Sequence, residues 1–264
     1  MNTSESDPNL PSSTSTAPPR KLRIATGGAV LFAMLFPSLT AWIYFVVLAE
    51  TATTAGGTSY LALGAYALSK VVQFTFPLIW VVLVERRRLR ITRPKLAGLV
   101  LGLAFGLCVM AIIFVAYGAY LRSSPVLAST PERVLSRIKA FHADTPLRYA
   151  LMTLFLAGVH SLMEEYYWRW FVFRELKGLL APGAAIALSS LAFMAHHVII
   201  LWIYLPGRFL TAVVPFSLCV AGGGMAWAWL YHRTGSIYSV WLSHLLVDAA
   251  LFVLGYDLIF VQSL

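Results

Sequence analysis

Charged residues are scarce in this sequence. Lysine, arginine, aspartate and glutamate make up 12% of its 264 residues, and 59% of the residues are hydrophobic. A typical soluble domain is about a quarter charged and has no use for so much apolar surface. The composition therefore excludes a soluble globular protein. It predicts an all-α, polytopic membrane protein, with several spans of about 20 apolar residues each.

Cysteine is nearly absent as well. Cys108 and Cys219 each fall in the middle of an apolar segment, neither has a thiol nearby in the sequence, and no CxxC motif occurs. We expect both to be small buried hydrophobic residues. Basic residues outnumber acidic ones by 20 to 11, but they cluster at the ends of apolar segments. Such clusters set orientation against a membrane, so the net charge does not indicate a nucleic-acid partner.

Residues 1–20 are rich in Ser, Thr and Pro, and we expect a disordered tail ahead of a transmembrane domain over 21–264. The first apolar segment is too long for a signal peptide and lacks a small-residue cleavage site, so it is expected to remain as a span.

Seven stretches are long enough to cross a membrane, at roughly 24–49, 59–84, 96–121, 149–173, 184–205, 210–231 and 237–255. The residues after Tyr256 extend the last span or lie at the interface, and the pattern leaves open whether there is an eighth span.

The basic residues predict a cytoplasmic N-terminus. With the N-terminus inside, twelve basic residues fall on the cytoplasmic side and six on the outer side, and the dense run from Arg86 to Lys95 contributes most. Seven spans then place the C-terminus outside. If the chain is bacterial, the membrane is the cell membrane.

The largest outer loop contains STPERVLSRIKAF. Thr130 is expected to cap a helix whose first residue is Pro131, and Val134, Ile138 and Phe141 share one face of it. The pattern is typical of a short amphipathic helix on the membrane surface, with a solvated connector as the alternative. Elsewhere, GGGMA at residues 222–226 has the small-residue spacing of closely packed helices.

Two adjacent glutamates interrupt the fourth span. Residues four apart share a helix face whereas neighbours diverge by about 100°, so Arg169 is expected to pair with Glu165 and to leave Glu164 facing another partner. His160 lies on the face of Glu164, where it hydrogen-bonds the carboxylate or packs against another helix. An ion pair that only braces the bundle would explain Glu165 and Arg169, but not Glu164.

Histidines recur in the later spans. His196 and His197 are adjacent, so only one is expected to meet Glu164, and His244 and Asp248 share a face of the last span. With the N-terminus inside, Glu164, His197 and His244 all lie roughly 10–20 Å from the cytoplasmic surface at 1.5 Å per residue. Polar groups at a common depth on three helices favour a site that activates water.

These residues carry a family resemblance. EEYYWR matches EExxxR, FMAHH matches FxxxH, and HLLVD matches HxxxN/D, in that order on successive spans. Together the motifs, over roughly residues 147–255, resemble the CPBP intramembrane proteases, also called the CAAX prenyl protease or Abi family. The resemblance implies an endopeptidase that cleaves membrane-associated proteins or peptides, prenylated ones included, within membrane lipids.

The resemblance also implies roles for individual residues. Glu164 and His197 would activate water, and His244 with Asp248 would stabilise the oxyanion. The supporting residues would be Glu165, Arg169, His160 and His196.

The sequence departs from the family pattern at two positions. Trp170 follows the arginine where glycine is common, and Asp248 stands where many members have asparagine. An ionised aspartate would repel an oxyanion, so Asp248 is expected to be protonated, to orient His244, or to bind a metal. Glu164, His197, His244 and Asp248 would form a zinc ligand set, and a metalloprotease stays one of the alternatives.

Other functions stay open at this stage. HExxH is absent, the GYD at residues 255–257 lacks a second aspartate motif, and the TGS at 234–236 fits a capping turn, so other intramembrane protease types fit poorly. A proton-coupled transporter or channel would use the same buried Glu and His residues, although no inverted repeat is evident. A non-catalytic immunity or scaffold protein is the third alternative.

Overall fold

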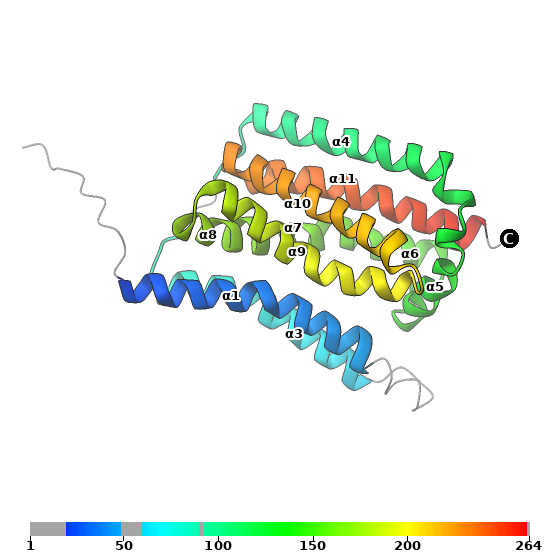
Figure 1. Cartoon of the computed structure of the whole chain (residues 1–264), viewed down its shortest axis with the longest axis horizontal. Helices are drawn as coiled ribbons and strands as arrows, with labels where there is room; N and C mark the ends of the chain where they lie inside the picture. Colours follow the sequence, from blue (N-terminus) through cyan, green and yellow to red (C-terminus); the bar gives the residue numbers. More distant parts are fainter. Residues whose placement is uncertain (1–19, 49–59, 90–91, 263–264) are drawn as a thin grey trace, which may run out of the picture.

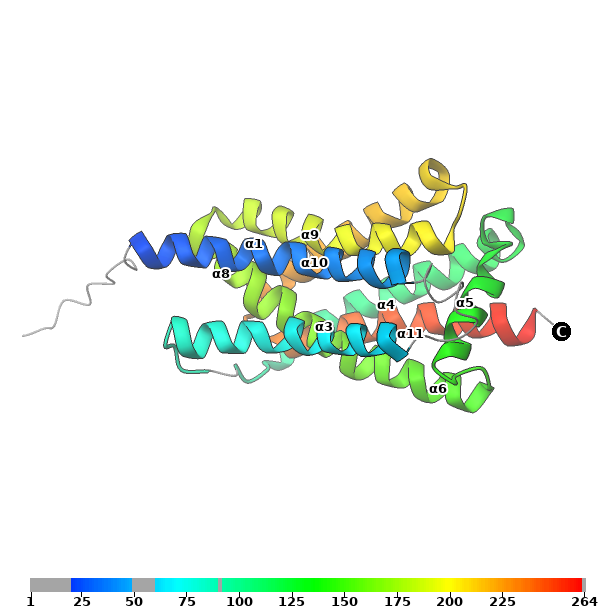
Figure 2. The same cartoon turned by 90° about the horizontal axis from the view of Figure 1, so that it is seen from below.

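The structure is a computed structural model that describes residues 20–48, 60–89 and 92–262, and these residues form helices and connecting loops without a strand. The helices run roughly along one direction as a bundle (Figures 1 and 2). In Figure 1, α4 (Leu96–Ala119) and α11 (Ile237–Tyr256) lie at one side, and α1 (Arg20–Trp42) and α3 (Tyr60–Ile79) lie at the other. The all-α, polytopic class predicted from composition is confirmed, and the chain is an integral, multi-pass membrane protein. The expected tail over residues 1–20 lies outside the described residues except for Arg20, which begins α1.

Six helices of the described chain are long and apolar enough to cross a membrane. The expected span over 149–173 lies in a continuous helical stretch too, but Glu164, Glu165 and Arg169 lie in its middle and it is not among the six. The last span runs from Ile237 to Val261, so residues 257–261 extend it beyond Tyr256. The six spans are Arg20–Val47, Leu63–Val84, Leu96–Ala119, Pro182–Tyr204, Phe209–Thr234 and Ile237–Val261.

The elements that build these spans are the following: α1 Arg20–Trp42 and η1 Ile43–Val47; α3 Tyr60–Ile79 and η2 Trp80–Val84; α4 Leu96–Ala119; α9 Pro182–Tyr204; η7 Phe209–Val213 and α10 Val214–Thr234; α11 Ile237–Tyr256 and η8 Asp257–Val261. Short turns η3 Leu121–Ser123 and η4 Pro125–Leu127 lead from α4 to α5, Thr130–Ala140. The stretch that holds the two glutamates consists of α6 Pro146–Phe155, η5 Leu156–His160, α7 Ser161–Glu165, η6 Tyr166–Phe173 and α8 Arg174–Leu179.

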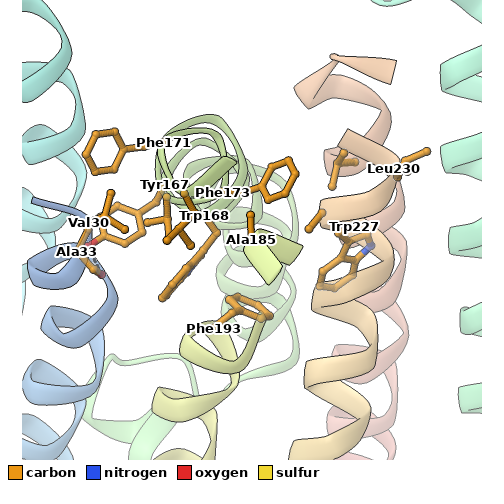
Figure 3. Packing of buried hydrophobic residues seen from close by; sticks show 14 of the residues in the cluster. Val30, Ala33, Tyr167, Trp168, Phe171, Phe173, Ala185, Phe193, Trp227 and Leu230 are labelled. Atoms are coloured by element: carbon orange, nitrogen blue, oxygen red, sulfur yellow. Dashed lines mark hydrogen bonds between the residues drawn. The ribbon is translucent and has the colours of Figure 1, made fainter. Parts of the chain in front are cut away.

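The core lies where η6 crosses the bundle. Tyr167, Trp168 and Phe171 are at most 1% exposed, and they pack among side chains of α1, α9 and α10, including Phe193 and Trp227 (Figure 3). The Tyr167 hydroxyl donates to the Ala33 carbonyl of α1 at 2.7 Å. Burying three large aromatic side chains next to Glu164 and Glu165 fixes the rotation of this stretch, because aromatic side chains dominate the packing energy of a core.

Glycines let α4 and α11 approach closely. Gly98, Gly102 and Gly106 are buried at four-residue spacing, and a Cβ on Gly102 would lie 2.0 Å from the Ser239 carbonyl oxygen. The glycine motif at 222–226 acts similarly at one position only, since a Cβ on Gly224 would lie 3.1 Å from Ser190 Cβ whereas Gly222 meets nothing. Small residues at membrane helix interfaces allow such contact between backbones.

Several local expectations change. The expected helix over the outer loop is present as α5, but Ser129 precedes it at the cap position and Thr130 Oγ1 donates to the Tyr204 carbonyl instead. Ile138 is buried against Tyr149 and Ile259, so part of the apolar face packs on the protein, whereas Phe141 stays exposed.

The expected turn at residues 234–236 is present. Gly235 ends α10 with φ of +63°, a conformation that glycine adopts without strain. The two cysteines, by contrast, were expected to be buried and are exposed. The lipid-facing side of a span is as apolar as the core, so hydrophobic surroundings in the sequence do not distinguish the two.

The α4–α11 contact yields the first prediction. Gly102→Ala should lower the stability of the protein by about 1–3 kcal/mol, because the added methyl group collides with backbone that cannot move aside. Gly118→Ala, in the same helix with nothing near its Cβ, is the matched control and should be neutral or slightly stabilising. Thermal unfolding of both variants in nanodiscs measures the difference, and equal melting temperatures would contradict the close contact.

Candidate active site

Four helical stretches bring the polar residues together. Glu164 and Glu165 end α7, Arg169 lies in η6, His196 and His197 lie in α9, and His244 and Asp248 lie in α11. The two glutamates lie between the π-helical segments η5 and η6, in which each turn is widened. Such segments often occur at functional sites.

Glu165 is the fixed carboxylate of the pair. It is fully buried, its Oε1 accepts from Arg169 Nη1 at 2.9 Å, and the same oxygen lies 2.7 Å from His244 Nδ1. Because an ionised carboxylate only accepts hydrogen bonds, His244 Nδ1 donates and its Nε2 is left to face elsewhere. The predicted pairing of Glu165 with Arg169 is therefore present, and it also orients His244.

Arg169 is held on every side. Its guanidinium donates to the Gly224 carbonyl at 3.4 Å and lies over the rings of Phe193 and Trp227, 4.8 and 5.2 Å from their centroids. The side chain is only 2% exposed. Cation–π contacts and a carboxylate partner together compensate the loss of water around a buried charge.

Glu164 faces the histidines. Its Oε1 lies 3.4 Å from His160 Nε2 and 4.0 Å from His196 Nε2, and its Oε2 lies 3.7 Å from His244 Nε2. The carboxylate is 9% exposed by residue. It thus lies at the meeting point of imidazoles from η5, α9 and α11, as expected for a glutamate that does not pair with Arg169.

The structure distinguishes the two adjacent histidines of α9. His196 approaches Glu164 and stacks on Trp168 with ring centroids 5.8 Å apart. His197 Nδ1 lies 3.0 Å from the Phe193 carbonyl of its own helix, and in the described chain its nitrogens make no comparable approach to a carboxylate. Because a carbonyl can only accept, His197 Nδ1 carries the proton and Nε2 keeps its lone pair.

His244 and Asp248 meet as their spacing predicts. His244 Nε2 lies 3.5 Å from Asp248 Oδ1, one turn along α11. The imidazole stacks on Trp227 with ring centroids 4.1 Å apart, and the Trp227 indole donates to Ser243 Oγ at 3.0 Å. Trp227 belongs to the site although no motif marked it, because an aromatic residue in an apolar span carries no polar signal.

The expected zinc set does not assemble. A zinc ion needs nitrogen and oxygen ligands about 2.0–2.2 Å away, all around one point. Within the described residues, no group of three or more His, Cys, Asp and Glu side chains is arranged to hold a metal ion. The four predicted ligands are therefore not gathered around one point, and a metalloprotease is not supported.

Trp170, the departure from the family pattern, is accommodated beside the core. It is half-buried, stacks on Tyr166 with ring centroids 5.2 Å apart, and lies under the Arg174 guanidinium at 4.8 Å. The tryptophan, which is much larger than the glycine common at this position, therefore packs between an aromatic and a cationic neighbour.

A second group of charges lies beyond the end of α3. Arg87 forms ion pairs with Glu85 and with Glu175 of α8, and Trp80 Nε1 donates to Glu85 Oε1 at 3.2 Å. Burial and the neighbouring Glu175 carboxylate raise the pKa of Glu85, and Arg87 partly offsets this. The group joins α3 to the helix that follows the site.

Fold and site define a class: a polytopic helical membrane protein with a buried cluster of carboxylates and imidazoles. Residues 146–250 match the family model described as type II CAAX prenyl endopeptidase Rce1-like. The match confirms the resemblance to the CPBP, or CAAX prenyl protease, family, and it indicates a CAAX-type intramembrane protease that acts on protein substrates. Comparison with curated proteins and with solved structures gave no match.

The shared contacts of Glu165 yield a second prediction. Glu165→Gln and Arg169→Met should each destabilise the protein by about 3–5 kcal/mol, because each leaves a buried charge without its partner. The double variant should be less destabilised than the sum of the two, since they share one interaction. Thermal unfolding of all four proteins measures the coupling, and strictly additive losses would show that the pair is not coupled.

Proposed function

We propose that the chain is an intramembrane endopeptidase in which Glu164 and His197 activate water for attack on a peptide carbonyl. The observation that carries the proposal is the position of Glu164. Its carboxylate is buried, does not pair with Arg169, and faces the imidazoles of His160, His196 and His244. A carboxylate so placed accepts a proton from water without first breaking a strong ion pair.

The two later histidines take different parts. We assign the second hydrogen bond of the water to His197 because the FxxxH motif falls on it and because its Nε2 keeps a lone pair when Nδ1 contacts the Phe193 carbonyl. His196, although it lies nearer to Glu164, is assigned a supporting part. His244 Nδ1 donates to Glu165, and its Nε2 faces the acceptor oxygens of Glu164 and Asp248. With carboxylates at both nitrogens, the ring is an imidazolium with a proton on each nitrogen, and its Nε2–H is the donor toward the oxyanion that forms on the carbonyl. The supporting residues are Glu165 and Arg169, which set the His244 ring, and His160 and His196, which flank Glu164.

The reaction balances within this set. Water oxygen bonds to the carbonyl carbon while its proton passes to Glu164, and the oxyanion accepts from His244. When the carbon–nitrogen bond breaks, the leaving amine takes the proton from Glu164, which returns the carboxylate to its initial state. The substrates are membrane-associated proteins or peptides, and the family match favours prenylated ones.

Loss of the proposed base tests the proposal. Glu164→Gln should lower the rate of peptide cleavage by about 10²–10⁴-fold with little loss of stability, because glutamine fills the same space but cannot accept the proton. Glu132→Gln, which removes an exposed acid of α5, is the control and should retain full activity. Cleavage of a panel of C-terminal membrane peptides by folded protein in nanodiscs is the assay. Wild-type activity in the Glu164→Gln variant would eliminate Glu164 as the base.

Asp248 provides a separate test. Asp248→Asn should keep the rate within a few-fold of wild type or raise it, because an amide oxygen can still face His244 and does not repel an oxyanion. The rate and the metal content of both purified proteins should be measured together. A large loss of rate accompanied by loss of bound metal would instead make Asp248 a metal ligand.

A further inference from the structure

A pocket lies where α5 meets the ends of two membrane spans. Its volume is about 490 Å³, within the range of sites that hold small molecules. Phe45 of η1 lines it on one side and Trp202 and Tyr204 of α9 on another, and α5 contributes the polar side chains. None of the residues that line this pocket belongs to the candidate active site.

The polar lining is provided mainly by two arginines. Arg133 and Arg137 are four residues apart, so they share one face of α5. The Arg137 guanidinium lies over the rings of Tyr44 and Phe45, 5.2 and 5.1 Å from their centroids, and Arg133 Nη1 donates to the Ile203 carbonyl at 3.2 Å. A guanidinium that rests its face on aromatic rings keeps the N–H donors at its edge for another partner.

The contacts of these arginines do not neutralise them. In the part of the chain that the structure describes, neither guanidinium has a carboxylate within ion-pair distance. Aromatic rings and a backbone carbonyl attract a cation less strongly than an anion does. The pocket therefore holds two positive charges with N–H donors to spare, and the fork of a guanidinium matches the oxygens of a phosphate group.

The pocket lies at the level of the lipid headgroups. Its lining includes the last residues of the spans Arg20–Val47 and Pro182–Tyr204. At the same end of the bundle, Trp42 and Trp202 stack with ring centroids 6.1 Å apart, and each is 44% exposed. Tryptophan is enriched where a span meets the membrane–water interface, and basic pockets between membrane helices bind phospholipid headgroups.

We propose that this pocket binds the headgroup of an anionic phospholipid, with the lipid phosphate between the guanidiniums of Arg133 and Arg137. The exposed ring of Trp202 lies at the edge of the pocket, where it provides apolar surface for the acyl chains. A lipid held in this way would join α5 to the ends of α1 and α9. Its binding does not depend on the proposed role of Glu164.

The test compares the protein in nanodiscs of phosphatidylcholine with the protein in nanodiscs that also contain phosphatidylglycerol, whose headgroup carries no compensating cation. The anionic lipid should raise the melting temperature of the wild type by about 2–4 °C or more, because a ligand that binds only the folded state stabilises it. Arg133→Gln and Arg137→Gln should each lose most of this increase. The phosphatidylcholine sample of each variant measures the structural cost of the substitution, so the increase reports binding alone.

The matched control is Lys139→Gln, which removes an exposed cation of the same helix that does not line the pocket. This variant should keep the full increase. An equal loss in Lys139→Gln would mean that the lipid is attracted to basic α5 in general, and it would overturn the pocket. The absence of any increase in the wild type would overturn it as well. Arg133 is exposed, so its substitution keeps the test valid if Arg137→Gln does not fold.

Inorganic phosphate distinguishes a lipid from a free anion. Added to the protein in phosphatidylcholine nanodiscs, it should change the melting temperatures of the wild type and of Arg137→Gln equally. An increase with phosphate that requires both arginines and matches the increase with phosphatidylglycerol would mean that the pocket holds a free anion, and it would exclude the lipid.

Discussion

The site depends on a single oxygen atom. Glu165 Oε1 accepts from Arg169 and from His244, so it joins a cation of η6 to an imidazole of α11 in the dry interior. Neither partner has an equally close alternative. Arg169 has aromatic faces and one backbone carbonyl, and His244 has the more distant Asp248 and Glu164. Removing one member would leave a charge without solvent, which is why such groups hold a geometry tightly.

That interaction requires α11 to lie close to α7, and the packing of α11 is set from its other side. Gly102 and Gly106 of α4 remove the side chains that would hold α11 away, and Gly106 lies against Ser243, the neighbour of His244. Trp227 closes the remaining side by stacking on the imidazole and donating to Ser243. The position of one histidine therefore follows from residues on three other elements.

The sequence predicted the polar part of this arrangement better than the apolar part. Helical periodicity alone separates Glu164 from Glu165 and pairs the latter with Arg169, because four-residue spacing fixes a face. Periodicity could not predict whether His196 or His197 lies nearer to Glu164, since this depends on the rotation of α9 against its neighbours. The sequence did not indicate the contacts of Trp168 and Trp227 with the site, because aromatic residues are common in membrane spans. The prediction that Cys108 and Cys219 are buried was wrong, because the lipid-facing side of a span is as apolar as the protein core.

The zinc set is an alternative that the structure does not support. Residue types alone allowed four ligands, but a metal site needs lone pairs aimed at one common point, and among the described residues no group of three or more such side chains is arranged in this way. The family match, over residues 146–250, covers every residue that performs the proposed chemistry and begins after α3. Phe74 of α3 lies outside the match, yet its ring contacts the ring of His160, with centroids 6.0 Å apart. The surroundings of the proposed site therefore include a part of the chain that the family match does not cover, so a change at Phe74 can alter the setting of His160 while leaving the matched residues in place.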